Sequence, residues 1–129
     1  IEGNLAMADE LIDPNYVEHD AANPEDIVGI DAFKEQITYI RTNYPDFNVT
    51  AEELIVKDDR IVCRWIATGT NTGTTNDLPP TGKKIQIEGV DILRVVDGKI
   101  VERLMYYNEA TMLRQLGFTI TPPQEPSEQ

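Results

Sequence analysis

The sequence predicts an α+β domain in which helices pack into a strongly curved antiparallel β-sheet. Two segments with helical spacing of apolar residues come first, long β-branched segments joined by tight turns follow, and a short helix closes the pattern. The 129 residues match the size of one domain with one core. We therefore expect one folded unit over residues 1–118 and a flexible tail over residues 119–129, which has little apolar surface to order it.

The two N-terminal helices are predicted from the period of their apolar residues. Residues 5–12 place leucine, alanine and isoleucine on one stripe, and Pro14 prevents the helix from continuing. Residues 31–44 repeat apolar side chains at intervals of three and four, and Pro45 ends this helix. The segment between them, residues 16–29, is expected to be a mixture of extended chain and loop.

Strands dominate the second half of the chain. Asp97-Gly98 is a strong hairpin signal, so the strands on either side of it should pair antiparallel. Residues 71–84, rich in Gly, Thr, Asn and Pro, are expected to form a long loop. Residues 109–116 form the predicted last helix, with Gly117 as its C-cap. The predicted strands are residues 49–57, 60–70, 85–96 and 99–107.

The charge and the cysteine content restrict the classes of partner. There are 23 acidic and 11 basic residues, a formal charge of -12 that repels nucleic-acid phosphates and anionic lipid. We expect neither nucleic-acid nor membrane partners, and no apolar run is long enough to cross a bilayer. The single cysteine, Cys63, lies in an apolar stretch, which is typical of a buried thiol in a cytoplasmic protein.

Four motifs, in order, carry a resemblance to a known family. They are "YVEHD", "GT" followed by "LPPTGKKI", "VVDGKIVE" and "LRQLGF". In this order, over residues 3–118, the chain resembles the SnoaL-like polyketide cyclases, whose cone-shaped fold is shared with nuclear transport factor two and ketosteroid isomerase. Members usually carry one more helix before the segment matching "GNLAMADELI". The resemblance implies a deep apolar cone in which an aspartate closes a ring by aldol condensation, as acid and base, without a cofactor.

The position that the resemblance assigns to this aspartate, counted back from "RQLG", is Asn108. An amide has no titratable proton near neutral pH, so Asn108 cannot replace the aspartate, although it could orient a carbonyl group or a water molecule. Asparagine is also a favoured N-cap, and a predicted helix begins directly after it. Two interpretations remain open: Asn108 is only a cap, or it is a cap that also contacts a ligand.

Two other residues are candidates for the missing acid/base group. His19 resembles a residue at the mouth of the family's pocket, and its ordinary pKa lies near neutrality. Its structural alternative is a contact with Asp20 or the backbone. Asp91 lies in an apolar strand, where relatives often have a histidine, and an inward carboxylate there would be costly without a partner. Its alternatives are exposure or pairing with Arg94 or Arg64.

Ligand-binding candidates are taken from the aromatic residues and from strand alternation. Leu104, Tyr106 and Asn108 should share one face of their strand, with Met105 and Tyr107 on the other. The resemblance places the position of Leu104 toward the cone, so Tyr106 and Asn108 are expected to border the cavity. The ligand-binding candidates are therefore Tyr16, Trp65, Leu104 and Tyr106.

Two hypotheses about function follow. The protein is a cofactor-independent cyclase, isomerase or hydrolase acting on a hydrophobic small molecule, or it is a non-catalytic binding or dimerisation module of the same fold. One histidine and scattered carboxylates form no metal-ligand spacing, so no metal site is expected. Apolar residues on both faces of the strands predict a homodimer packed through the sheet.

Overall fold

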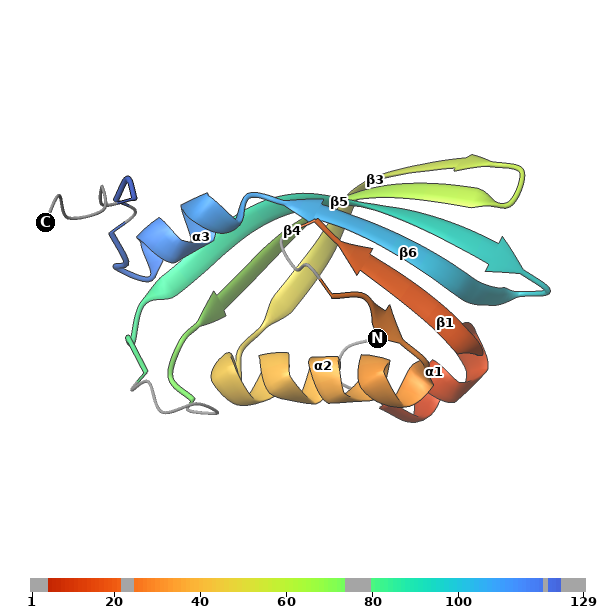
Figure 1. Ribbon diagram of the computed structural model, residues 1–129, viewed down its shortest axis with the longest axis horizontal. Coiled ribbons are helices and arrows are strands. Elements are labelled where there is room, and N and C mark those ends of the chain that lie inside the picture. The colour runs from red at the N-terminus through yellow and green to blue at the C-terminus, as the bar shows by residue number, and fades with distance from the viewer. Residues whose placement is uncertain (1–4, 22–24, 74–79, 120, 124–129) are drawn as a thin grey trace, which may run out of the picture.

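The computed structural model describes residues 5–21, 25–73, 80–119 and 121–123. Most of the predicted tail, and residues 74–79 of the predicted loop, lie outside these ranges. The elements follow in the order α1 (Leu5–Leu11), β1 (Ile12–Asp20), β2 (Ile27–Val28), α2 (Ile30–Asn43), β3 (Asn48–Lys57), β4 (Arg60–Thr70), β5 (Lys84–Val96), β6 (Lys99–Tyr107) and α3 (Glu109–Gln115) (Figure 1).

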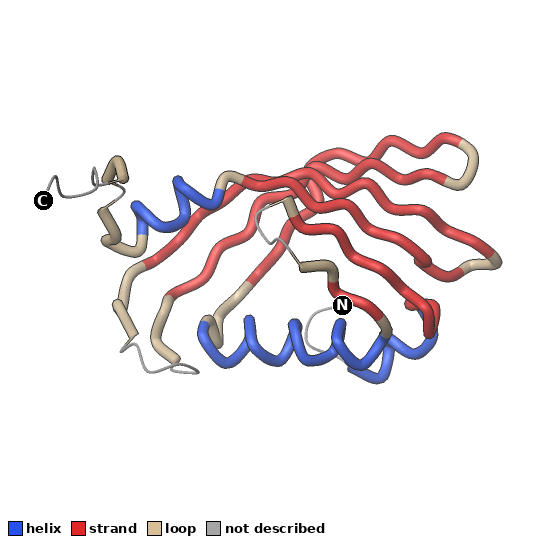
Figure 2. Tube along the Cα trace, viewed as in Figure 1, coloured by secondary structure: helices blue, strands red, loops and turns tan. Residues whose placement is uncertain are grey.

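The strands form one curved sheet in the order β2-β1-β6-β5-β4-β3, and α2 lies across its concave side (Figures 1 and 2). Neighbouring strands are antiparallel except β1 and β6, which run parallel. The predicted α+β fold is confirmed. No helix in the described part of the chain is long and apolar enough to cross a membrane.

The turn between β5 and β6 shows how local sequence sets this topology. Asp97 and Gly98 have φ angles of 51° and 78°. Positive φ at both central residues matches the right-handed twist of the two strands that they join. The hairpin signal is thus confirmed, and it aligns β6 with the part of β5 from Gly89 to Val96.

Strand β1 differs from the expectation of mixed extended chain and loop. It continues for nine residues and contains Pro14. Its pairing with β6 is irregular between Ile12 and Val17, the segment that holds the proline, which lacks a backbone donor. A parallel partner more than 80 residues away leaves no local signal in the sequence, so β1 could not be predicted from its own residues.

Two buried clusters hold the helices on the sheet. The first joins both N-terminal helices to β1, and in it the rings of Tyr16 and Phe33 meet edge to face at 5.4 Å. The second surrounds Trp65 on the central strands and includes Met112 of α3. The first cluster thus holds α2 on the concave side, and the second holds α3 against the strands around Trp65.

Candidate functional site

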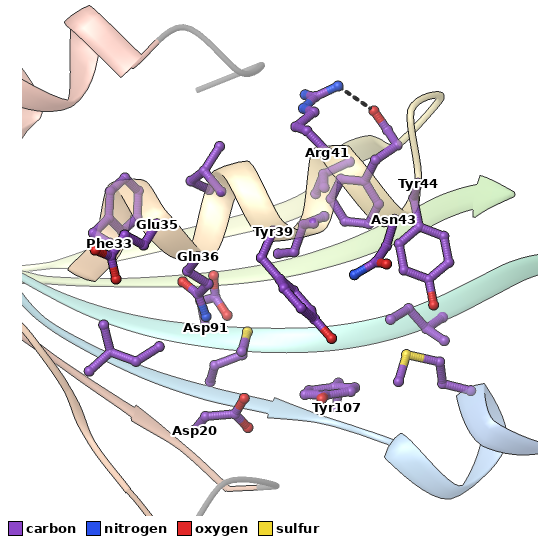
Figure 3. Close-up of a pocket in the computed structure, with 18 of the residues that line it drawn as sticks. Asp20, Phe33, Glu35, Gln36, Tyr39, Arg41, Asn43, Tyr44, Asp91 and Tyr107 are labelled. Atoms are coloured by element: carbon purple, nitrogen blue, oxygen red, sulfur yellow. Dashed lines mark hydrogen bonds between the residues drawn. The ribbon is translucent and has the colours of Figure 1, made fainter. Parts of the chain in front are cut away.

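A cavity of about 1470 Å³ lies between α2 and the concave face of the sheet. Figure 3 shows Gln36 and Tyr39 of α2 on one side, with Asp91 and Tyr107 of the sheet opposite them. Most of the lining is apolar or aromatic, which is typical of a small-molecule site. The aromatic side chains of the wall include Tyr16, Phe33, Tyr39, Tyr44, Trp65 and Tyr107.

Asp91 is a carboxylate in this wall, with 13% of its side chain exposed. Its Oδ1 accepts a hydrogen bond of 3.0 Å from the indole Nε1 of Trp65. Its Oδ2 accepts one of 3.0 Å from Nε of Arg103, and the Nη2 of the same guanidinium is also 3.0 Å away. The partner of Asp91 is therefore Arg103. Arg64 and Arg94, the partners considered from the sequence, form ion pairs with other carboxylates.

Gly89 makes the contact between Trp65 and Asp91 possible. It stands opposite Trp65 in the β4–β5 register, and a Cβ atom at this position would lie 2.2 Å from Cζ2 of the indole. Only glycine leaves room for a ring to cross the neighbouring strand this closely. The indole can then reach the carboxylate two residues along β5.

Glu18 belongs to the same polar cluster as Asp91, Trp65 and Arg103, but it lies behind the cavity wall. Its side chain is fully buried and does not line the cavity. Its Oε1 accepts hydrogen bonds from the Tyr16 hydroxyl at 2.6 Å and from Nη1 of Arg103 at 3.0 Å. Its Oε2 accepts one of 2.8 Å from Nε2 of Gln36. Both carboxylate oxygens are thus bonded, as a buried charge requires.

The electrostatics of the cluster keep Arg103 charged. Burial lowers the pKa of the Arg103 guanidinium, but Asp91 and Glu18 raise it by more, so the pKa stays above its ordinary value. Burial raises the pKa of the Tyr16 hydroxyl well above its usual range, although Arg103 opposes this. Tyr16 is therefore a neutral hydrogen-bond donor, and the cluster consists of one guanidinium between two carboxylates.

Residues 2–116 match the family model described as SnoaL-like polyketide cyclase. The chain belongs to this family. Nogalonic acid methyl ester cyclase of Streptomyces nogalater is 28% identical over 122 residues, which cover 89% of this chain and 87% of that protein. The structure of TsrD from Streptomyces laurentii is 25% identical, with a TM-score of 0.79, over 90% of this chain and 84% of that one. A protein of Catenulispora acidiphila with a ketosteroid isomerase-like fold, 17% identical over 92% of this chain and 86% of its own, shares the fold with a TM-score of 0.74.

Asn108 occupies the position that the resemblance to the SnoaL-like family assigns to the acid/base aspartate, and here it is an N-cap. Its Oδ1 accepts a hydrogen bond of 2.9 Å from the backbone N–H of Thr111, which confirms the predicted cap of α3. Asn108 does not line the large cavity and instead borders a separate surface depression together with Tyr106. The expectation that Asn108 borders the cavity is therefore wrong.

The same correction applies to Leu104 and Tyr106. Neither lines the cavity, and Tyr106 is 50% exposed. The predicted alternation is right, but its assignment to the two faces is reversed, because the pairing of β6 with β1 and β5 determines which face is concave. The β6 residues in the cavity wall near the polar cluster are Arg103, Met105 and Tyr107.

His19 lies on the opposite face of β1 from the cavity residues and does not line the cavity. Its Nδ1 is 2.9 Å from Oδ1 of Asp26, and its Nε2 is 3.4 Å from Oε2 of Glu102. The hydrogen bond with Asp26 raises the pKa of His19 above its ordinary value. His19 itself is outside the cavity lining, while its partner Asp26 is part of it, and this geometry fits an ion-pairing role.

Three of the candidate residues lie in the cavity wall, namely Tyr16, Trp65 and Asp91. Three residues of this site were not among the candidates from the sequence: Glu18, Gln36 and Arg103. Strand alternation could have indicated Glu18, since it has the same parity as Tyr16 and the opposite parity to His19. Among the described residues, no group of three or more His, Cys, Asp and Glu side chains could hold a metal ion.

Proposed function

We propose that this SnoaL-like protein is a cofactor-independent acid/base enzyme that closes a ring in a hydrophobic small molecule bound in the cavity. One observation carries the proposal. Asp91 places a carboxylate in an otherwise largely apolar cavity wall, and neighbouring donors hold that carboxylate in one orientation. Membership of a polyketide cyclase family supports ring closure over the isomerase and hydrolase reactions that the fold also permits.

The reacting atom that we assign is Oδ1 of Asp91. A carboxylate oxygen offers about two acceptor sites. Oδ2 faces two nitrogen atoms of Arg103, whereas Oδ1 accepts from Trp65, so the remaining acceptor site lies on Oδ1. A base must come within hydrogen-bond reach of the proton that it removes, and Oδ1 on the cavity wall satisfies this condition for a bound ligand.

The proposed reaction is an intramolecular aldol addition. Oδ1 of Asp91 removes a proton from a carbon next to a substrate carbonyl, and the resulting enolate carbon forms a bond with a second carbonyl carbon of the same molecule. The alkoxide then takes the proton back from Asp91, which is restored as a carboxylate. No atom is gained or lost. The positive charge of Arg103 in the same wall stabilises the negative charge that develops on the enolate.

The test uses nogalonic acid methyl ester, the compound named for the relative from Streptomyces nogalater. Wild-type protein should convert it into a product of the same mass with a new chromatographic retention time. The Asp91→Asn variant keeps the size of the side chain and removes the base, so kcat should fall by about 10²- to 10⁴-fold. Glu88→Gln is the matched control, because Glu88 lies on β5 but does not line the cavity. An Asp91→Asn variant with wild-type kcat would contradict the assignment.

A second candidate function is non-catalytic binding of a small apolar ligand. Asn108 favours it, since the position that the resemblance assigns to the acid/base aspartate holds an amide that caps a helix. The same assay separates the two functions. Saturable binding of the ester by calorimetry without turnover, together with unchanged affinity in Asp91→Asn, would support the binding module and contradict the enzyme.

A further inference from the structure

We propose that Glu18 is a positioning residue, which acts through Arg103 to hold the carboxylate of Asp91 in the orientation and the charge environment that the reaction needs. The inference rests on the proposed function, since Asp91 is the base of that reaction. Glu18 itself touches no ligand, because its fully buried side chain lies behind the cavity wall.

The contacts form one continuous path across four neighbouring strands. Glu18 of β1 contacts Nη1 of Arg103 of β6 at 3.0 Å, and Nε of the same guanidinium contacts Asp91 of β5 at 3.0 Å. Trp65 of β4 closes the path at 3.0 Å from Asp91. A guanidinium is a planar fork with fixed donor directions, so a partner that holds one edge of it also orients the other edge.

Stability alone does not explain a carboxylate at this place. A buried ion pair can often be replaced by apolar residues of similar size without loss of stability, because desolvation offsets the attraction. Glu18 nevertheless carries three hydrogen bonds, from Tyr16, Gln36 and Arg103. Of these three donors, Tyr16 and Gln36 lie on β1 and α2, so both walls of the cavity fix Glu18.

The charge of Glu18 also affects the base. Two carboxylates share one guanidinium, so Arg103 attracts Asp91 less strongly than an unshared cation would. When Glu18 is neutralised, Asp91 is the one charged partner of Arg103 in this cluster, and a negative charge near Asp91 is removed. Both changes favour the ionised carboxylate, so Asp91 becomes a weaker base. Other titratable groups on the elements around Asp91 include Asp20, Glu35, Cys63 and Tyr107, none of which this substitution replaces. Tyr16 bonds directly to Glu18, and it remains a neutral donor when Glu18 loses its charge.

Trp65 provides a readout that does not depend on turnover. It is the single tryptophan of the chain, and its indole N–H donates directly to Asp91. Its fluorescence should therefore change when Asp91 takes up a proton. A pH titration of the wild-type emission should show one step that is absent in Asp91→Asn. In Glu18→Gln, which keeps the shape of the side chain, the midpoint should move to lower pH by about half a unit or more.

The matched control is Glu102→Gln. Glu102 is the neighbour of Arg103 in sequence and is also paired with arginines, but it does not line the cavity and contacts His19. The same change of charge at Glu102 should leave the midpoint of the Trp65 titration within about 0.1 pH unit of the wild-type value, since solvent screens the partly exposed ion pairs of Glu102. Equal midpoints in wild type and Glu18→Gln, or equal shifts in Glu18→Gln and Glu102→Gln, would overturn the proposal.

Activity gives a second test. Glu18→Gln should lower kcat on nogalonic acid methyl ester by about tenfold, keep KM within about twofold, and move the acidic limb of the pH–rate profile to lower pH. A purely structural role would lower the melting temperature without moving this limb. If the wild type shows no turnover, the proposed function fails, while the fluorescence titration still decides whether Glu18 acts on Asp91.

Arg103→Lys tests the same link should Glu18→Gln fail to fold. One ammonium group cannot reproduce the fork that contacts both carboxylates. The midpoint of the Trp65 step should then move to higher pH, because Asp91 loses part of its cationic partner. A midpoint equal to that of the wild type would show that Arg103 does not transmit any effect to Asp91 and would overturn the proposal.

Discussion

Glu18 and His19 are neighbours on β1 and face opposite sides of the sheet. Glu18 is fully buried and bonded to Arg103 beside the cavity, whereas the His19 side chain is 39% exposed and pairs with Asp26 and Glu102. Successive side chains of a strand point to opposite faces, so one step along β1 separates a residue of the buried polar cluster from a partly exposed residue that pairs with carboxylates. His19 has an ordinary pKa near neutrality, but its side chain does not line the cavity.

Gly89→Ala should displace the indole of Trp65. The new Cβ atom would lie 2.2 Å from the ring, so the ring must move and the hydrogen bond with Asp91 should be lost. We expect a loss of about 1–3 kcal/mol in the free energy of unfolding, measured in urea, and a change in the tryptophan emission. Gly69→Ala is the comparison, because Gly69 also lies in the paired part of β4 and β5. A Cβ atom there would lie 3.1 Å from Tyr44, which needs to shift only slightly. Equal losses in both variants would contradict this account.

His19 should make stability depend on pH. Its folded pKa is raised above the ordinary 6.5, chiefly by the hydrogen bond with Asp26. The stabilisation is therefore fully present below the unfolded pKa and is lost as pH rises through the folded pKa. Urea unfolding of wild type and His19→Gln at about pH 5.5 and 8.5 should give a larger difference at the lower pH. The effect should be small, because solvent screens the pair.

Asp26→Asn is the matched control for that measurement. It keeps the size of the side chain that pairs with His19 and removes its charge. The gain in the free energy of unfolding from about pH 8.5 to about pH 5.5 that His19 provides should therefore be smaller in Asp26→Asn than in the wild type. Turnover should remain at the wild-type level in His19→Gln, since His19 does not line the cavity. A large loss of kcat in His19→Gln would show that His19 takes part in the reaction.

Asn108→Asp should be neutral within about 0.5 kcal/mol or slightly stabilising, because aspartate caps as well as asparagine and its charge suits a helix N-terminus. Asn108→Ala should cost about 1 kcal/mol, since the N–H of Thr111 loses its acceptor. Thermal unfolding measures both. A gain of pH-dependent turnover in Asn108→Asp would contradict the placement of this residue outside the cavity.

The convex face of the sheet should form a homodimer. Val62, Ile92 and Leu104 lie side by side in the strand register, and none of them lines the cavity. A contiguous apolar patch on an open sheet face is typical of a protein–protein interface. We expect a dimer by light scattering at micromolar concentration and a monomer for Leu104→Arg. A monomeric wild type would contradict the proposal. Glu10→Arg, a substitution of an exposed residue of α1, serves as control.

Features that depend on neighbouring residues could be predicted from the sequence. The Asp97-Gly98 turn has the positive φ angles that its residues favour, α2 follows the period of its apolar side chains, and Asn108 caps the helix that begins after it. Each of these depends on backbone preferences and hydrogen bonds within a few residues. The same local patterns, together with the family motifs, indicated the curved sheet and made Asp91 a candidate for its wall.

Only the tertiary structure decided which face of each strand forms the cavity. Arg103 and Glu18 are 85 residues apart and meet because β1 runs parallel to β6 in one particular register. A shift of that register by one residue would exchange the two faces of the strand, placing Tyr106 in the cavity and Tyr107 outside it. Alternation within β6 is a property of its own sequence, but the direction of the curvature and the pairing across the sheet come from packing against α2 and β1. The chemistry of the site therefore depends on contacts between distant segments, which local sequence does not record.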